Sequence, residues 1–159
     1  MIKFIVEGKP FGKQRPRFRR TGKFVSTYTP KETVDYEEKV RKSFLKENKS
    51  NGEYEDCVSV TINAYFKPPK SISKKKYNEL IGKPYLKKSD CDNIAKIICD
   101  PLNKIAYKDD CQVYNLTVNK YYCEEEYVEV VIKYEEKEWI RIGCISNFKS
   151  TIQRQEILL

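Results

Sequence analysis

Residues 87–113 read KKSDCDNIAKIICDPLNKIAYKDDCQV and combine an apolar helical pattern with an unusual density of acids. From residue 92 onward, isoleucines and a leucine recur at helical spacing, which predicts a helix over about residues 92–100. At about 100° per residue, Asp92, Lys96 and Asp100 share one arc of about 80°, opposite the isoleucines. Burial of the isoleucines would therefore aim a polar stripe outward at a fixed angle.

Further aspartates flank this predicted helix. Asp90 lies just before it, where helix amides favour negative charge, and Asp109 and Asp110 precede the next predicted strand. The short connection KIAYK could return Asp110 toward the helix start, so that Asp90, Asp92 and Asp110 converge. Such carboxylates repel one another unless a cation joins them, and oxygen-only ligands suit Mg²⁺ or Mn²⁺. The alternative is structural, with acids that cap a helix and form a turn.

Lys96 has two interpretations. It lies four residues after Asp92, so the two can form a surface ion pair worth only a few tenths of a kcal/mol. It can also act as a cation beside a metal, positioned to hold a scissile phosphate and stabilise its developing charge. Both interpretations stay open on the sequence alone.

The chain as a whole is basic, with 31 lysines and arginines against 23 acids, or +8, over 159 residues. Such a charge favours a polyanionic partner, nucleic acid first and an anionic membrane second, although a generally soluble basic protein is the alternative. Residues 8–31 carry eight of these positive charges and no acid, and their glycines and prolines predict a loop or irregular ribbon. The candidates for contact with a nucleic-acid backbone are Lys13, Arg15, Arg17, Arg19, Arg20 and Lys23.

The remaining segments predict an α+β fold, with a small mixed sheet packed against helices. Strands are expected over residues 2–7, 57–66, 111–122 and 126–136, and a short helix capped by Ser73 over 74–82. A helix over about 31–46 would turn its apolar residues to the core; these are Val34, Tyr36, Val40, Phe44 and Leu45, with Glu37 at the edge. We expect one domain over residues 1–137 and an appendage of unknown role over 138–159.

The composition also excludes several kinds of chemistry. The chain has no histidine, so acid–base work must fall to carboxylates, lysine, tyrosine or a metal-bound water. Its six cysteines show no CxxC spacing, which makes a zinc site a weak hypothesis and free buried thiols the better one. We see no signal peptide and no apolar run of about 20 residues that could cross a membrane, so a cytoplasmic protein is expected by default.

Taken together, these motifs resemble those of RusA-type Holliday junction resolvases. The family signature D-x-D-N-x-x-K, D-x-L-N and D-D-x-Q-V is matched here by DCDNIAKIICDPLN and DDCQV. The amino-terminal GKPFGKQRPRF and YTPKETVDYEEKV resemble the corresponding segment of phage and prophage members, and the resemblance covers roughly residues 1–135. One departure is Pro101, where the family usually has alanine; a proline there predicts that the helix ends or kinks.

The resemblance implies a small homodimer that resolves four-way DNA junctions by paired cleavage with Mg²⁺, with Mn²⁺ as a substitute and no small-molecule cofactor. It would serve DNA recombination, repair or phage DNA processing. The catalytic and metal-binding aspartates of the family carry over to Asp90, Asp92 and Asp110, and its essential lysine to Lys96; Asp100 and Asp109 also match motif positions. The aromatic residues of the basic stretch could wedge at an opened junction centre or anchor the loop on the core; they are Phe11, Phe18, Phe24 and Tyr28.

Three rival functions remain on the sequence alone. The first is a non-catalytic nucleic-acid-binding module whose acids are structural. The second is a metal-dependent nuclease that prefers flaps, forks or single strands. The third is a protein-binding adaptor that uses the aromatic-containing tail beyond residue 137.

Overall fold

Four strands form a mixed sheet in the order β1-β6-β4-β5 in a computed structural model that describes residues 1–22, 24–48, 54 and 56–135. β5 is parallel to β4, and the other neighbouring strands are antiparallel. The bounds are Ile2–Glu7 for β1, Cys57–Phe66 for β4, Val113–Tyr122 for β5 and Tyr127–Glu135 for β6. With three helices and a second, two-stranded sheet, the chain has the predicted α+β fold.

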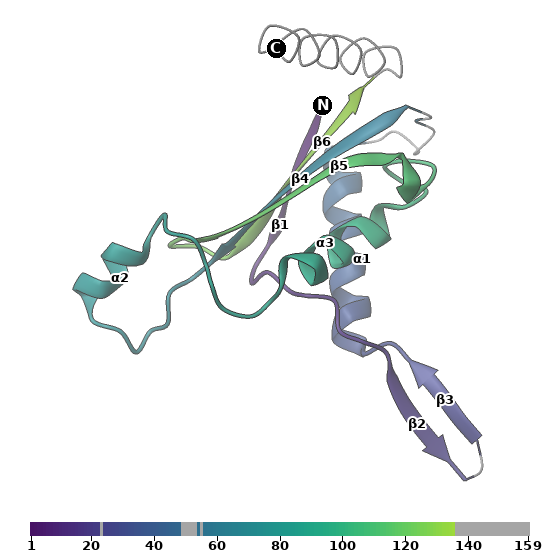
Figure 1. Ribbon diagram of the computed structural model, residues 1–159, viewed down its shortest axis with the longest axis horizontal. Helices are drawn as coiled ribbons and strands as arrows, with labels where there is room; N and C mark the ends of the chain where they lie inside the picture. Colours follow the sequence, from purple (N-terminus) through teal and green to yellow (C-terminus); the bar gives the residue numbers. More distant parts are fainter. Residues whose placement is uncertain (23, 49–53, 55, 136–159) are drawn as a thin grey trace, which may run out of the picture.

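Two helices cover one face of this sheet, as Figure 1 shows. They are α1 (Lys31–Glu47) and α3 (Cys91–Leu102), whereas the short α2 (Lys74–Leu80) lies beyond one end of the sheet. Along β4, buried and half-buried residues alternate, because successive side chains of a strand point to opposite faces. The core therefore lies between this face of the sheet and the apolar sides of α1 and α3.

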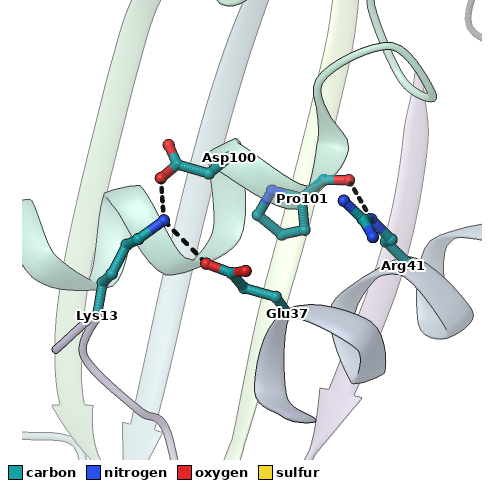
Figure 2. A network of polar contacts seen from close by, with 5 residues as sticks. All are labelled: Lys13, Glu37, Arg41, Asp100 and Pro101. Carbon is teal, nitrogen blue, oxygen red and sulfur yellow. Dashed lines mark hydrogen bonds and ion pairs between the residues drawn. The ribbon is translucent and has the colours of Figure 1, made fainter. Parts of the chain in front are cut away.

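Helix α3 has the apolar stripe that its sequence predicts. Ile94, Ile97, Ile98 and Leu102 are fully buried, and the helix begins after Asp90, its N-cap. The helix includes Pro101 and ends one residue later, at Leu102, close to the end that the proline predicted. Arg41 of α1 donates its Nε hydrogen to the Pro101 carbonyl oxygen at 3.2 Å and so joins the two helices (Figure 2).

Two predictions about α1 were wrong. Val34 and Leu45 are exposed, not packed on the core. The buried stripe of α1 instead passes through Thr33, Val40 and Phe44, which share one side of a helix of 3.6 residues per turn. The prediction placed the buried face of α1 by hydrophobicity alone. It therefore chose Val34 and missed Thr33, a polar residue that lies on the same side of the helix as Val40 and Phe44.

The basic stretch also differs from the predicted loop or irregular ribbon. β2 (Arg17–Thr21) and β3 (Phe24–Tyr28) pair as an antiparallel hairpin that projects away from the sheet and helices (Figure 1). Gly22 at the turn has φ of 63°, a left-handed conformation that glycine adopts at little cost. Aromatic and β-branched residues between two prolines explain the strands in retrospect.

The cysteines in the described residues are free, as predicted, but none of them is fully buried. Of the five in the described residues, Cys91 and Cys111 are exposed and the other three are partly buried. Cys144 and the appendage predicted over 138–159 lie outside the described residues. Within the described part of the chain, none of the helices combines the length and the apolar character needed to cross a membrane.

A pair of leucine variants tests this packing. Leu102→Ala should lower the free energy of unfolding by roughly 2–5 kcal/mol, because it leaves a cavity in the core. Leu45→Ala should cost at most about 1 kcal/mol, since much of the Leu45 surface already faces water. Urea denaturation of both variants measures the difference, and equal losses would contradict the assigned faces of α1 and α3.

Candidate active site and nucleic-acid interface

The first turn of α3 presents two exposed carboxylates. Asp90 is the N-cap, yet its side chain makes no capping hydrogen bond in the described structure, and Asp92 lies in the first turn. The backbone amides at this end of the helix favour negative charge. Asp92 pairs with Lys96 at 3.8 Å, and both side chains are more than half exposed, so this ion pair contributes at most a few tenths of a kcal/mol. The Asp92 carboxylate and the Lys96 ammonium can therefore separate and bind other charged groups at little cost in free energy.

A second acidic element lies just before β5. Residues Asp110–Gln112 form a single 3₁₀ turn, with Asp109 as its N-cap. The Asp109 carboxylate accepts a hydrogen bond from the Cys111 amide at 3.0 Å, and the Gln112 side-chain oxygen accepts one from the Asp109 amide at 2.8 Å. Hydrogen bonds from the Cys111 thiol and amide lower the pKa of Asp109. Asp109 therefore has a structural role here, whereas the side chain of Asp110 is exposed.

Gln112 fastens this turn to the entry of β4. Its side-chain amide donates hydrogen bonds to the carbonyl oxygens of Tyr54 at 2.7 Å and Asp56 at 2.9 Å. All the hydrogen-bonding atoms of the Gln112 side chain are thus engaged in holding the backbone around Asp110. This explains physically why a glutamine suits the D-D-x-Q-V pattern.

Tyr107, three residues before Asp110, contacts the second half of α3. The buried Tyr107 hydroxyl donates a hydrogen bond to the Cys99 carbonyl oxygen at 2.9 Å. Burial is the main reason that the pKa of Tyr107 lies above its ordinary value and that the pKa of the Cys99 thiol rises to about 11, and the negative charges of Asp100 and Asp110 contribute to both shifts. The charge of Asp110 thus acts on groups at the end of α3, whereas Asp90 and Asp92 lie at the start of that helix.

The basic arm, residues 11–28, is docked on that first turn. The Lys13 amide donates to the Asn93 carbonyl oxygen at 2.9 Å. A Cβ atom on Gly12 would lie 2.9 Å from the Cβ of Ser89 and 3.3 Å from that of Asn93, closer than ordinary side chains approach. Only glycine therefore lets the arm lie this close to the start of α3.

Lys13 continues the contact with its side chain. Its ammonium forms ion pairs with Asp100 of α3 and, at 2.8 Å, with Glu37 of α1, and Figure 2 shows it between the two carboxylates. Burial lowers the pKa of Lys13, but its hydrogen bonds with Asp100 and Glu37 outweigh that effect and raise the pKa above its ordinary value. The structure thus places Lys13, a predicted DNA contact, in a network that holds three segments together, and gives Asp100 a partner.

The projecting part of the arm exposes both charge and aromatic surface. Gln14 donates to Glu32 of α1 at 2.9 Å and accepts from Arg17 at 3.3 Å, which ties the arm to α1 just before the hairpin. Arg15, Arg17, Arg19 and Arg20 are exposed, and Lys23 lies outside the described residues.

The aromatic residues of the arm divide into two groups. The Phe11 ring packs against Tyr36, with centroids 5.6 Å apart, and against the core, so it anchors the arm. Phe18, Phe24 and Tyr28 are 75%, 82% and 47% exposed on the hairpin. Such apolar exposure on a projecting basic hairpin is typical of a binding surface.

Comparison with known proteins assigns the chain to a family. The family model described as Endodeoxyribonuclease RusA matches residues 7–133, which include both the acidic helix and the basic arm. The chain belongs to the RusA endodeoxyribonuclease family. A relative, the uncharacterized protein YqaN of Bacillus subtilis (strain 168), is 37% identical over 137 residues, covering 83% of this chain and 95% of that protein. RusA membership implies an endonuclease that resolves Holliday junctions, and it confirms the resemblance drawn from the sequence.

The donor chemistry of this RusA-family chain fits a hard divalent ion. Asp90, Asp92 and Asp110 are all exposed carboxylates, and carboxylate oxygens are the protein ligands that Mg²⁺ prefers. Within the described ranges, no three acidic or cysteine side chains are gathered closely enough to hold a metal. The sequence had not indicated the supporting roles of Gly12, Glu37 and Gln112, although Gln112 stood in the quoted signature.

The anchoring role of Gln112 leads to a stability prediction. Gln112→Ala should lower the free energy of unfolding by roughly 1–3 kcal/mol, because the carbonyls of Tyr54 and Asp56 and the Asp109 amide lose their partner. Asn115→Ala, an exposed polar position on β5, is the matched control and should cost much less. If chemical denaturation shows the two variants to be equally stable, Gln112 does not anchor the turn.

Proposed function

We propose that this RusA-family protein is a Mg²⁺-dependent endodeoxyribonuclease that resolves four-way junctions by paired phosphodiester cleavage, with Asp90, Asp92 and Asp110 as metal ligands. The observation that carries the proposal is the start of α3, where a family-matching acid occupies the N-cap but keeps its carboxylate free of capping bonds. A purely structural N-cap aspartate would use that carboxylate to bond the helix amides.

The residues at α3 have separate tasks in this proposal. A divalent ion held there, Mg²⁺ or as a substitute Mn²⁺, would supply an activated water and neutralise charge on the scissile phosphate. Lys96 holds the phosphate: its bond to Asp92 is long and exposed, so the ammonium can turn to an incoming anion. Asp110, whose turn is fastened through Gln112, would supply a further ligand from the segment before β5.

The projecting hairpin is proposed as the DNA contact. Its arginines, with Arg15 and Lys23, neutralise backbone phosphates, which releases counterions and makes binding salt-dependent. The exposed rings of Phe18, Phe24 and Tyr28 are placed to wedge or stack where junction bases are opened. Lys13 contributes indirectly, because its ion pairs fix the base of the arm on α1 and α3.

The proposal also includes an oligomeric state, the bounds of the nuclease domain and a cellular setting. A four-way junction has approximate two-fold symmetry, so a homodimer would bring two matching sites to two strands. The nuclease domain would span residues 1–137, with 138–159 as an accessory segment. We place the protein in the cytoplasm, in DNA recombination, repair or phage DNA processing, with no small-molecule cofactor.

Charge-removing variants at the acidic site test the chemistry. Asp90→Asn and Asp110→Asn should each slow cleavage of a four-way junction in Mg²⁺ by at least about 100-fold, the scale expected when one charge-stabilising group is lost from an active site. Asp35→Asn, an exposed aspartate of α1, is the control and should cleave normally. Gel-shift binding in EDTA should stay nearly unchanged in all three variants.

Two results would defeat this assignment. One is normal cleavage by both Asp90→Asn and Asp110→Asn. The other is that the wild type cleaves flaps, forks or single strands in Mg²⁺ but leaves four-way junctions uncleaved. The preferred substrate would then be another DNA structure.

The hairpin leads to a second functional prediction. Arg19→Ala combined with Arg20→Ala should weaken junction binding and reduce the slope of log affinity against log salt by about 2, since each phosphate contact contributes about 0.9. Lys42→Ala with Lys46→Ala removes the same charge from exposed positions toward the far end of α1 and should leave most of the slope. Equal slopes for the two double variants would show that only net charge matters.

A further inference from the structure

Lys120 of β5 binds the segment that leads into α3. Its ammonium donates to the Ser89 carbonyl oxygen at 2.8 Å and to the Lys87 carbonyl oxygen at 3.3 Å. Ser89 immediately precedes Asp90, the N-cap of α3. A charged side chain of the sheet thus holds the backbone directly before the acidic site.

The surroundings make Lys120 a rigid support. The Tyr85 amide donates to the Lys120 carbonyl oxygen at 2.9 Å, and the Lys120 ammonium lies 5.8 Å from the centroid of the Tyr85 ring. That ring stacks on Phe66, with centroids 3.9 Å apart, and meets Tyr122 edge-on at 5.0 Å. Packing on the sheet therefore limits the positions that the ammonium can take.

Ser89 is also held by the basic arm. Gly12 approaches Ser89 so closely that a Cβ on Gly12 would lie 2.9 Å from the Cβ of Ser89. The arm contacts the Ser89 side chain, while Lys120 binds its carbonyl oxygen. These two contacts fix the backbone just before Asp90.

This arrangement explains an unusual feature of α3. An aspartate at an N-cap ordinarily fixes the helix start through its own carboxylate, which accepts from an amide of the first turn. Asp90 makes no such bond, yet the first helical hydrogen bond, from the Ile94 amide to the Asp90 carbonyl oxygen, is formed at 3.1 Å. Backbone anchoring by Lys120 can replace the missing cap and leave the carboxylate available.

We propose that Lys120 is a positioning residue for Asp90: it holds the carbonyls of residues 87 and 89, so that the Asp90 carboxylate is oriented for a divalent cation without serving as a helix cap. This inference rests on the proposed function where it concerns the cation, and on hydrogen bonds alone where it concerns the backbone. A lysine that merely stabilised the fold would affect stability but not the site.

The experiment compares Lys120→Met, Lys120→Arg and Lys120→Gln with Lys133→Met, an exposed lysine of the same sheet, in the full chain. One readout is Mn²⁺ affinity by electron paramagnetic resonance, together with the Mg²⁺ concentration at half-maximal junction cleavage. The second is hydrogen exchange of the Ile94 amide without metal. Lys120→Met should weaken Mn²⁺ binding by about tenfold or more, as expected when a group that orients a ligand is lost.

Ile94 exchange in Lys120→Met should accelerate by about tenfold relative to Lys133→Met, because a hydrogen bond from a charged donor is lost at the helix start. Lys120→Arg should restore most of both properties, and Lys120→Gln, which keeps an uncharged donor group, should lie between. If Lys120→Met does not fold, the order wild type, Lys120→Arg, Lys120→Gln still decides the question.

Unchanged Mn²⁺ affinity and unchanged Ile94 exchange in the folded Lys120 variants would overturn the inference. Failure of the proposed function looks different: the wild type would then neither bind Mn²⁺ nor cleave junctions. The Ile94 exchange would in that case still measure whether Lys120 fixes the backbone at Asp90.

Discussion

The backbone at Gly12 and Lys13 lies directly on the first turn of α3, and the relation between the basic hairpin and the acidic helix depends on this contact. It requires a residue without a Cβ at position 12, a hydrogen bond from the Lys13 amide to Asn93, and ion pairs from the Lys13 ammonium to α1 and α3. The arm that would hold DNA is thus fixed to the helix that would cut it.

The aspartates divide by their partners into two kinds. Asp100 and Asp109 are engaged, one with the Lys13 ammonium and the other with the amide of Cys111. Asp90, by contrast, makes no capping bond within the described structure, and Asp92 has only a long, exposed pair with Lys96. Burial of the isoleucines fixes α3, and engaged neighbours fix the local backbone. Exposed carboxylates can then be held in place without using their own oxygens.

The sequence predicted what periodicity and local chemistry determine. The bounds of β1 and β4 and the buried face of α3 follow from residues adjacent along the chain. It did not predict the hairpin, whose strands are short and whose first strand is rich in arginine. Nor did it predict the position of Lys13, which depends on carboxylates 24 and 87 residues away. Contacts between distant segments, such as Lys120 with the residues before Asp90, leave no periodic pattern. The metal-ligand assignment itself stays a prediction.

In the proposed function, Asp90, Asp92 and Asp110 coordinate divalent metal beside a DNA phosphate. Anomalous scattering from Mn²⁺ in crystals of the protein with a four-way junction tests it most directly. We expect metal coordinated by oxygens of these carboxylates and of the DNA backbone, with the Lys96 ammonium near the same phosphate. An ion bound elsewhere in a cleavage-competent complex, with Asp90 and Asp110 left uncoordinated, would contradict it.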